Sequence, residues 1–561
     1  MTFRAGWLLL LLTVSMNRSG AAGPTLDYVF PIAWTQGATN TVTLGGKFES
    51  WPVRVWADCP GVDFNTGTNN GKLSVHVTQD APAGPHLLRV FTADGVSSPR
   101  FFIITDRPDE LEREPNDGLN QAQPIATLPA TITGRLDKSG DVDSFSVHVE
   151  AGRWLVARAD AYVLGSPVDA TLQLLDERGR RVAFNHDSAQ SIDPLLAFPV
   201  EKSGTYVLRL AGFVHPPGSD IRYAGSAATI YRLTVTDGPF ASHAFPAGVQ
   251  RGRKTLLQLI GWNLGRTNRT QDQEFDASDL AAETDSALID APGVENRLRL
   301  AVSDLPELVE FEPNDSRAEA QPVTPPCVIN GRLSPSGDED RFRFAARKGE
   351  RFELRVQSAS LGFPIDATLE IEDSTGKQLA RDDDTGGPDP RILWNAPDVG
   401  SYVVAIRDLF HRGGEDCVYR LGIAAPVPDF KVTVAEHAFR LEPGKTNELK
   451  IEVSRFNGHT NALRVVLEGL PEGVTARPAP VTTKSAEVKV ALSAAGEVQP
   501  MNRPIRILVQ ADDESSPKMR PALFSLKPKD PRGDVLINQT DRLWLTVAAA
   551  SPQPKNAETK K

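Results

Sequence analysis

The feature that most constrains the fold of this chain is an internal duplication. The string Glu-Arg-Glu-Pro-Asn-Asp at 112–117 returns as Glu-Phe-Glu-Pro-Asn-Asp at 310–315. Further matches follow in the same order: 122–124 with 320–322, 134–136 with 331–333, 140–143 with 337–340, 167–172 with 364–369, 204–207 with 400–403 and 231–233 with 419–421. We therefore expect two structural units, here called the first and second repeat units, that fold in the same way.

The residues between these matches alternate as they do in half-buried β-strands. Segment 145–149 reads Phe-x-Val-x-Val and segment 342–346 reads Phe-x-Phe-x-Ala, so the same face is apolar in both copies. Turn signals such as Arg178-Gly179 and Thr375-Gly376 separate the alternating runs. With 44 Gly, 43 Pro and only 4 Met in 561 residues, the composition also favours strands and tight turns. The sequence predicts an all-β protein built from tandem β-sandwich modules.

The length of the chain is more than one core usually serves, so we expect several domains. A smaller β segment that reads as immunoglobulin-like precedes each repeat unit, and a third kind of β segment follows the second unit. The predicted division is a signal peptide at 1–22, an immunoglobulin-like domain at 24–106, the first repeat unit at 107–237, an immunoglobulin-like domain at 238–305, the second repeat unit at 306–425, an immunoglobulin- or fibronectin-like domain at 426–549 and a disordered tail at 550–561.

The N-terminus and the charge of the chain indicate where the protein acts. Arg4, the apolar run 7–14 and the small residues 19–22 have the order of a secretory signal. The apolar run is much shorter than the roughly 20 residues of a membrane span, so we expect a secreted protein (extracellular, cell-surface or periplasmic) without an integral membrane segment. The net charge of −11 comes with no basic stripe, which argues against a nucleic-acid partner.

Three cysteines are too few for a disulfide-built scaffold, so apolar cores must hold the modules. Cys327 and Cys417 lie near the two ends of the second repeat unit, where the first and last strands of a sandwich can be neighbours. A bridge between them and a pair of free thiols both stay open. Cys59 is expected to be a buried free thiol without the surroundings that activate a nucleophile.

Two tryptophans near the N-terminus have two possible roles. Trp51 and Trp56 would face opposite sides of one strand if the segment is extended. One of them could then stack on a sugar, but packing in a core or between domains is the favoured interpretation.

Three motifs of the repeat units together resemble the bacterial pre-peptidase C-terminal domain, whose relatives include the collagen-binding modules of secreted clostridial collagenases. These motifs are Glu-Pro-Asn-Asp, Gly-Asp-x-Asp-x-Phe and Gly-Thr/Ser-Tyr. The resemblance covers a little under half of the chain and implies a jelly-roll-like sandwich, commonly an accessory to a peptidase. The segments before the repeat units resemble TIG and related immunoglobulin-like folds, and the last segment resembles a domain appended to glycoside hydrolases and other exported proteins.

The same resemblance implies one calcium ion per repeat unit, because some members of the family bind calcium near the N-terminal linker. Calcium-binding relatives can carry a further aspartate three residues before Asp141 and Asp338, where this chain has Lys138 and Pro335. One ion per unit is therefore expected rather than two. The implied ligands are Glu112, Glu114, Asn116, Asp117 and Asp141 in the first unit and Glu310, Glu312, Asn314, Asp315 and Asp338 in the second.

Calcium also suits these residues physically. In an extended segment Glu112, Glu114 and Asn116 point to one side, and calcium accepts six to eight carboxylate, amide or carbonyl oxygens. Carboxylates this close repel one another without a cation, so an ion would lock the segment onto the sandwich.

The competing interpretation is local. Asn116 or Asp117 would then serve only as a turn residue or as a cap of the short segment 118–123. Asp143 and Asp340 are expected at turns or strand ends rather than on a metal.

Catalytic motifs are missing from the sequence. None of the nine histidines lies in His-Glu-x-x-His, and neither Gly-x-Ser-x-Gly nor a Gly-rich phosphate loop is present. We expect a secreted, non-catalytic binding or scaffold protein that contacts an extracellular polysaccharide or protein. The alternative is an accessory protein or remnant of a secreted peptidase or glycoside hydrolase, because two carboxylates that meet only in space leave no motif.

Overall fold

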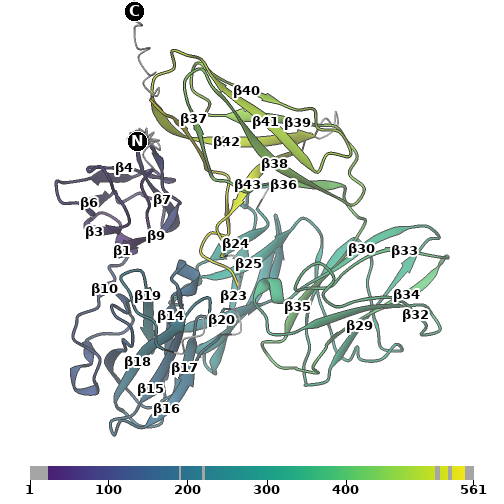
Figure 1. Ribbon diagram of the computed structural model, residues 1–561. Coiled ribbons are helices and arrows are strands. Elements are labelled where there is room, and N and C mark those ends of the chain that lie inside the picture. Colours follow the sequence, from purple (N-terminus) through teal and green to yellow (C-terminus); the bar gives the residue numbers. More distant parts are fainter. Residues whose placement is uncertain are drawn as a thin grey trace, which may run out of the picture.

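The computed structural model describes residues 23–188, 191–217, 222–282, 284–511, 518–528 and 533–549. The predicted signal peptide 1–22 and the predicted tail 550–561 lie outside these residues. The all-β prediction is confirmed, because the described residues form 45 strands and three short 3-10 helices. Five groups of strands follow one another along the chain and lie against each other in one assembly (Figure 1).

The N-terminal sandwich, residues 28–105, consists of two sheets packed face to face, with strand orders β1-β3-β6-β5 and β2-β9-β7-β4. Its strands pair antiparallel except for β2 and β9, which are parallel. Its core is centred on Trp34, whose ring stacks on Phe102 with the centroids 4.2 Å apart. The strands are β1 (Tyr28–Phe30), β2 (Ala33–Thr35), β3 (Thr39–Gly45), β4 (Arg54–Ala57), β5 (Val62–Asn65), β6 (Lys72–Val77), β7 (Gly84–Thr92), β8 (Gly95–Val96) and β9 (Arg100–Thr105).

The first repeat unit packs sheet β10-β12-β19-β14-β17 against sheet β11-β13-β18-β15-β16. Its elements are β10 (Glu110–Leu111), η1 (Leu119–Gln121), β11 (Gln123–Ile125), β12 (Ala130–Arg135), β13 (Asp143–Val149), β14 (Trp154–Asp160), η2 (Tyr162–Leu164), β15 (Val168–Leu175), β16 (Arg181–Asn185), β17 (Leu195–Pro199), β18 (Gly204–Val214) and β19 (Ile230–Thr236).

The second repeat unit has the same strand order, in sheets β26-β28-β35-β30-β33 and β27-β29-β34-β31-β32. Its elements are β26 (Glu307–Val309), β27 (Gln321–Pro322), β28 (Cys327–Arg332), β29 (Glu339–Ala346), β30 (Arg351–Gln357), η3 (Ala359–Leu361), β31 (Ala367–Glu372), β32 (Gln378–Asp382), β33 (Arg391–Asn395), β34 (Gly400–Asp408) and β35 (Val418–Ala424).

The alternation read from the sequence matches the cores of both repeat units. Phe145, Val147 and Val149 on β13 are buried, and so are their counterparts Phe342 and Phe344 on β29. Every second residue of these strands faces the opposite sheet, as the period of a pleated strand requires. This part of the prediction is confirmed.

A smaller middle sandwich of two three-stranded sheets, β20-β22-β23 and β21-β25-β24, lies between the repeat units. Its long strand β22 carries Leu257 and Leu259 into the core, where both are fully buried. The strands are β20 (Phe240–Phe245), β21 (Gly248–Gln250), β22 (Lys254–Leu264), β23 (Asn268–Asp276), β24 (Ser286–Ile289) and β25 (Leu298–Ser303).

The C-terminal sandwich is one continuous ten-stranded sheet that bends around a single core. The long strand β42 makes this possible, because 501–505 pair with β45 while 506–511 pair with β39. The strands are β36 (Asp429–Val434), β37 (Ala438–Leu441), β38 (Thr446–Phe456), β39 (Leu463–Glu468), β40 (Val474–Pro478), β41 (Glu487–Ala494), β42 (Met501–Ala511), β43 (Met519–Ser525), β44 (Gln539–Thr540) and β45 (Leu543–Val547).

The structure leaves all three cysteines free. Strands β28 and β35 are neighbours, as the bridge hypothesis required, but they are antiparallel, and Cys327 lies opposite Ile423. Cys417 precedes Val418, which lies opposite Arg332 at the other end of the pair. The open alternative of a Cys327–Cys417 bridge is therefore wrong. Cys59 is half-buried rather than buried.

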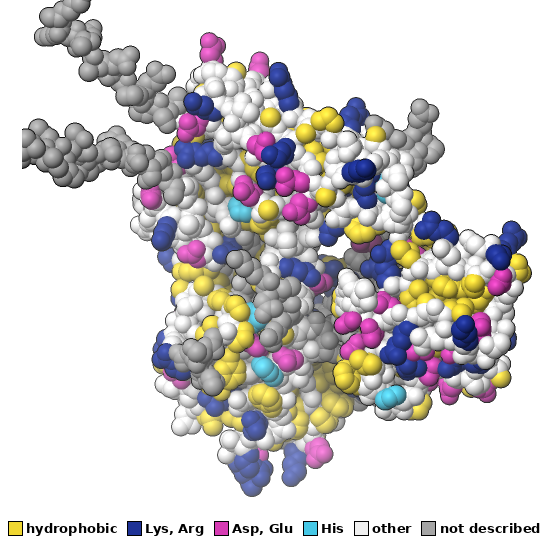
Figure 2. All heavy atoms as spheres, turned by 45° about the vertical axis from the view of Figure 1, so that its right-hand side comes forward, with side chains coloured by type: hydrophobic (Ala, Val, Ile, Leu, Met, Phe, Trp, Pro, Cys, Tyr) yellow, Lys and Arg dark blue, Asp and Glu magenta, His cyan; other side chains and the backbone are white. Residues whose placement is uncertain are grey.

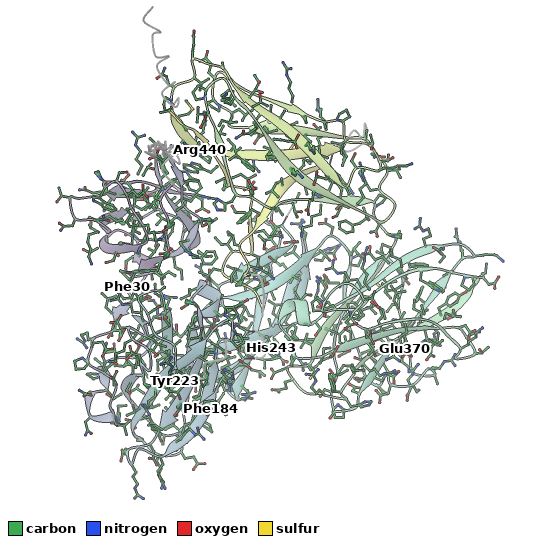
Figure 3. All side chains as sticks on the ribbon, viewed as in Figure 1. Phe30, Phe184, Tyr223, His243, Glu370 and Arg440 are labelled. Atoms are coloured by element: carbon green, nitrogen blue, oxygen red, sulfur yellow. The ribbon has the colours of Figure 1, made fainter. Side chains whose placement is uncertain are left out.

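The contact between each repeat unit and the sandwich before it is duplicated as well. The guanidinium of Arg135 lies 4.7 Å above the ring of Phe30, and that of Arg332 lies 4.4 Å above the ring of Phe245. Each arginine thus places a cation on an aromatic face of the preceding module. Phe30 lies where the N-terminal sandwich faces the first repeat unit (Figure 3).

The N-terminal and C-terminal sandwiches are in direct contact. The buried guanidinium of Arg89 donates hydrogen bonds to the Arg542 carbonyl at 3.0 Å and to Nδ1 of His437 at 2.8 Å. Burial and the nearby Arg89 charge lower the pKa of His437 to about 4, which keeps its imidazole neutral and able to accept. The ring of Trp56 lies 5.6 Å from that of Trp544, so Trp56 makes the favoured interdomain contact.

Further contacts hold the C-terminal sandwich to both repeat units. The Leu536 backbone N–H donates to the Val163 carbonyl at 2.8 Å in the first unit. Asn457 donates to Glu353 at 3.0 Å and accepts from Arg391 at 2.7 Å in the second. The C-terminal module therefore touches three other modules and closes the assembly.

Replacing Trp56 by alanine will weaken the contact between the N-terminal and C-terminal sandwiches by about 2 kcal/mol, because the variant loses a packed aromatic side chain. Calorimetry should show a lower unfolding temperature for the N-terminal module, and small-angle scattering should show a larger radius of gyration. Trp51→Ala is the matched control, since Trp51 contacts Phe48 and the Gly67 carbonyl within its own module. An unchanged radius for Trp56→Ala would contradict the closing role of this contact.

Candidate metal site

In each repeat unit, the duplicated acidic string carries the chain from one sheet of the sandwich to the other. We call 112–117 and 310–315 the linking segments. The first runs from β10, which pairs with β12, to the turn before β11, which pairs with β13 of the opposite sheet. The second does the same between β26 and β27. Both segments therefore cross the same end of the sandwich.

Three side chains of the first linking segment face one another, as the alternation predicted. Glu114 Oε2 accepts the backbone N–H of Asn116 at 2.9 Å, and Glu112 Oε1 accepts the Asn116 side-chain amide at 3.3 Å. Glu112 is also held by the backbone N–H of Arg135 at 2.9 Å. Asn116 is fully buried, yet its Oδ1 has no hydrogen-bond partner.

The carboxylates of Glu114, Asp117 and Asp141 converge beside this segment, with one oxygen of each within 4.8 Å of the others. Asp141 is fully buried. Its Oδ2 accepts the backbone N–H of Asp137 at 2.6 Å, whereas Oδ1 is buried without a hydrogen bond. Burial, with Asp117 close by, raises the pKa of Asp141. The predicted residues Glu114, Asp117 and Asp141 therefore form a cluster of carboxylate oxygens, and some of these oxygens have no hydrogen bond and could bind a metal ion.

A lysine already faces this cluster. The Lys138 ammonium lies 3.0 Å from Asp117 Oδ2 and 3.4 Å from Asp141 Oδ1. The hydrogen bond from Lys138 lowers the pKa of Asp117. Lys138 thus places a positive charge beside these acids. It stands three residues before Asp141, where calcium-binding relatives can carry a further aspartate.

The second repeat unit repeats the cluster without a lysine. One oxygen each of Glu312, Asp315 and Asp338 lies within 4.8 Å of the others. Asn314 is fully buried, and neither its Oδ1 nor its Nδ2 has a partner. Glu312 accepts the Asn314 backbone N–H at 2.8 Å, as in the first unit. Burial raises the pKa of both Glu312 and Asp338.

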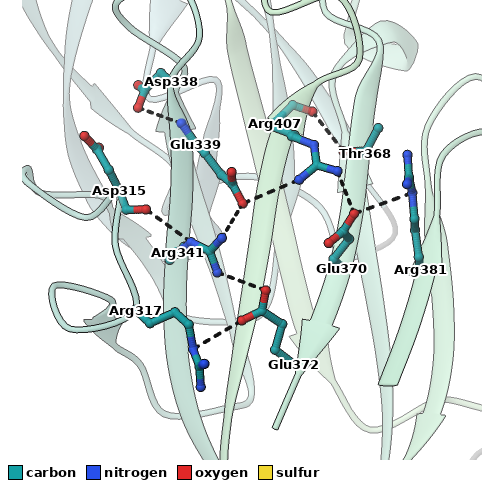
Figure 4. A network of polar contacts seen from close by, with 10 residues as sticks. All are labelled: Asp315, Arg317, Asp338, Glu339, Arg341, Thr368, Glu370, Glu372, Arg381 and Arg407. Carbon is teal, nitrogen blue, oxygen red and sulfur yellow. Dashed lines mark hydrogen bonds and ion pairs between the residues drawn. The ribbon is translucent and has the colours of Figure 1, made fainter. Parts of the chain in front are cut away.

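Arginine side chains on the outer face of the second unit support its linking segment (Figure 4). Arg341 donates from its backbone to the Asn314 carbonyl at 3.1 Å and from Nε to the Asp315 carbonyl at 3.1 Å. The same guanidinium pairs with Glu339 at 2.7 Å and with Glu372 at 3.1 Å. The segment is thereby fixed to β29 and β31, while its carboxylates stay directed at one another.

A buried carboxyl group behind each linking segment was missed by sequence reasoning. Asp143 is fully buried and accepts a 2.5 Å hydrogen bond from the Tyr231 hydroxyl, and Asp340 accepts one from Tyr419 at 2.6 Å. An oxygen of Asp143 also lies within 4.8 Å of Glu112 and Glu114. The available signal was the duplication itself, which keeps both the aspartate and the tyrosine. The prediction that Asp143 and Asp340 serve only turns or strand ends is incomplete.

The linking segment does not act as a helix cap. The short helix η1 has Gly118 at its N-cap and no side-chain capping hydrogen bond. Asp117 pairs with Lys138 instead, and the Asn116 carbonyl accepts the Ser144 backbone N–H at 3.1 Å. The capping interpretation is therefore wrong for both residues.

The surface shows no single-sign region on the face in view. Lys and Arg side chains are interspersed with Asp and Glu (Figure 2). In the described part of the chain, no helix combines the length and the hydropathy needed to cross a membrane.

These features define a modular β-sandwich protein with two related acidic clusters. No protein-family model matches the chain. Over 109 residues it is 32% identical to a protein named probable subtilase-type serine protease from Deinococcus radiodurans; the match covers 18% of this chain and only 15% of that protein.

Among solved structures, the chain is similar to the pre-peptidase C-terminal domain of a collagenase from Bacillus anthracis, with a TM-score of 0.17 and 17% identity over 20% of this chain and 99% of that domain. It is also similar to the fibronectin(III)-like modules of CbhA from Clostridium thermocellum, with a TM-score of 0.13 and 12% identity over 38% of this chain and 92% of those modules. At these TM-scores neither likeness bears on function.

The buried carboxyl groups predict how stability depends on pH when no cation is present. Burial, together with neighbouring acids, raises the pKa of Glu112 to about 7 and that of Asp143 to about 9. The folded protein therefore holds protons that the unfolded chain releases near pH 4. The stability they contribute is complete below that pH and is lost as the pH rises through about 7 and then about 9.

Melting temperatures measured with a chelator between pH 5 and 9 should therefore fall as the pH rises. Asp143→Asn keeps an acceptor for Tyr231 but carries no titrating proton, so its melting temperature should depend less on pH. Asp94→Asn, in the turn between β7 and β8 of the N-terminal sandwich and far from the linking segments in sequence, is the control and should retain the wild-type slope. A wild-type slope in Asp143→Asn would show that this carboxyl group does not titrate in that range.

Proposed function

We propose that this chain is a secreted, non-catalytic modular protein that binds an extracellular polysaccharide or protein, and that calcium stabilises it at the two linking segments. The observation that carries the calcium proposal is the set of buried polar atoms beside the converging carboxylates that have no hydrogen-bond partner. These atoms are Oδ1 of Asn116, both amide atoms of Asn314 and Oδ1 of Asp141, which faces the Lys138 ammonium at 3.4 Å. A buried polar atom without a partner costs about 1–3 kcal/mol, and a bound cation would remove that cost for the oxygens.

The chemistry of the donors favours calcium over other ions. Each cluster offers carboxylate and amide oxygens only, from Glu114, Asp117, Asp141 and Asn116 in the first unit. Calcium accepts mixed oxygen donors in irregular geometry, whereas zinc and copper prefer nitrogen and sulfur. Glu112 and Glu310 lie next to the Tyr–Asp pairs and would complete or orient the sites.

Two features support assigning both repeat units to the pre-peptidase C-terminal type with immunoglobulin-like flanking modules. The repeat units share their complete strand order. The arginine–phenylalanine contact with the preceding sandwich also occurs twice. We infer that the four N-terminal modules arose as two copies of one two-module block.

A scaffold role agrees with the contacts that the C-terminal sandwich makes with the other modules. The C-terminal sandwich touches the N-terminal sandwich and both repeat units, so each module has a fixed place. Such a body presents its outer sheet faces in constant relative positions. We propose these faces as the binding surfaces, and the mixed charges of the face in Figure 2 favour a polysaccharide or protein over nucleic acid.

The alternative function is an accessory role, or a remnant, of a secreted peptidase or glycoside hydrolase. The partial identity with a subtilase-type protease favours it, because modules of this kind can accompany a catalytic domain. The match spans 109 residues and 15% of that protein, and we propose that the shared part is an accessory module.

Calorimetric titration of calcium into the purified protein tests the metal proposal. We expect uptake by the wild type and none by Glu114→Ala, Glu312→Ala, which removes one converging carboxylate from each cluster. Free calcium at 100 times Kd should stabilise the wild type by about 2.7 kcal/mol per site. Equal uptake by wild type and double variant, or no uptake by either, would sink the proposal.

The lysine of the first unit provides a matched comparison of the two sites. Lys138→Ala removes the ammonium from Asp117 and Asp141, so calcium affinity in the first unit should rise about tenfold or more. Pro335→Ala changes the equivalent position of the second unit and should leave affinity there within about twofold.

A substrate screen distinguishes the two functions. The purified protein should bind cell-envelope material without turning over peptide or glycan substrates. Turnover that a single carboxylate substitution abolishes would favour the alternative. Binding should also persist in the Glu114→Ala, Glu312→Ala variant at reduced stability, since the outer sheet faces do not include those residues.

A further inference from the structure

A cysteine, a histidine and an aspartate meet at one edge of the N-terminal sandwich. Strand β4 pairs antiparallel with β7 up to Ala57, which lies opposite Leu88. The pairing continues into the loop, because the Asp58 backbone N–H donates to the Leu87 carbonyl at 3.1 Å. The next step of the register places Cys59 opposite His86. Chain pairing rather than chance proximity therefore brings these residues together.

The three side chains present one potential ligand atom each within 4.8 Å of one another. Nδ1 of His86 lies 3.5 Å from Asp58 Oδ1, and both side chains are mostly buried, with 13% and 18% exposed. Cys59 is half-buried and packs beside the core of the module. Cys59 therefore has a histidine and an aspartate beside it, neighbours that the sequence did not reveal.

The orientation of the His86 ring is fixed by a hydrogen bond on its far side. Nε2 lies 2.7 Å from the Pro82 carbonyl, which can only accept, so Nε2 carries a proton. Nδ1 is left facing the thiol and the carboxylate. Metal-binding histidines commonly donate their second ring N–H to a backbone carbonyl in this way, which sets the tautomer and the ring direction.

Asp58 is held in a similar manner. Its Oδ1 accepts the backbone N–H of Leu87 at 2.9 Å, which fixes the carboxylate against the first half of β7. The ring of His86 also packs against Phe102 of the core, with centroids 5.5 Å apart. Two of the three potential ligands are thus pre-positioned by the sandwich, and the third sits on the short loop that follows β4.

We propose that Asp58, Cys59 and His86 bind one zinc ion, with the fourth position left to water. Thiolate, imidazole and carboxylate are the ligands that zinc takes, and three protein ligands plus water is a common tetrahedral set. Ligand atoms around zinc lie about 3.5 Å apart, so a small closure of the Cys59 loop completes the geometry. The ion would tie that loop to β7.

This site is independent of the calcium proposal. The clusters at the linking segments contain oxygen ligands only, whereas this one has a sulfur and a nitrogen that calcium does not favour. The other two cysteines lie in the second repeat unit, where Cys327 and Cys417 are buried with 1% and 5% exposed. Any thiolate–metal signal can therefore be assigned to one residue.

Titration of cobalt(II) into the reduced protein tests the proposal. One equivalent should give the near-ultraviolet charge-transfer band of a thiolate–cobalt bond, and added zinc should abolish the band while excess calcium should not. Cys59→Ser and His86→Ala should lose it, whereas the Cys327→Ser, Cys417→Ser variant should keep it. No band in the wild type, or an equal band in Cys59→Ser, would overturn the zinc site whatever the calcium titration shows.

A second measurement avoids variants that fail to fold. In the native wild type, one equivalent of zinc should slow labelling of Cys59 by a thiol reagent at least tenfold, and a chelator should restore the rate. Labelling in denaturant counts all three thiols and serves as the reference. An unchanged native rate with zinc present would contradict the assignment, even if cobalt binds elsewhere on the protein.

Discussion

A chain that crosses from one sheet of a sandwich to the other must carry polar groups past the end of an apolar core, where each unpaired group is costly. In both repeat units the linking segment makes this crossing with acids and an asparagine. Behind it, Tyr231 holds the buried Asp143, and Tyr419 holds Asp340. Because β10 ends where this crossing begins and β11 follows it in the opposite sheet, the packing of the two sheets depends on how the charges of the crossing are balanced. The balance can come from protons, from a lysine or from a bound cation.

The assembly of the modules depends on a second repeated device. Arg135 and Arg332 are the last residues of β12 and β28, and each places its guanidinium on a phenylalanine of the preceding sandwich. Backbone atoms of the same two arginines hold Glu112 and Glu310. One residue in each unit therefore joins the acidic crossing to the neighbouring module.

The sequence was most informative where a pattern occurred twice. Alternation in 145–149 and 342–346 identified the buried faces of β13 and β29. The acidic strings marked the start of each unit, but only the strand pairing shows that they cross between the sheets. Long-range pairing was not accessible, since nothing in the sequence placed Cys327 and Cys417 at opposite ends of one strand pair. For the same reason the sequence did not indicate that Cys59 and His86 are neighbours. Only the pairing register of β4 and β7 brings them together. The tyrosine partners of Asp143 and Asp340 recur in the duplication, but the sequence does not indicate which acid each hydroxyl contacts.

The two crossings solve one electrostatic problem in different ways. In the first unit Lys138 brings a charge of its own to Asp117 and Asp141, so part of the repulsion is relieved within the chain. In the second unit Pro335 occupies that position. The Arg341 guanidinium binds the Asp315 carbonyl and pairs with Glu339 and Glu372, which lie outside the acidic cluster. A lysine close to the acids competes with an ion, whereas an arginine that pairs outside the cluster leaves room for one. We therefore propose the second crossing as the better cation site, although its sequence motif is no stronger than that of the first.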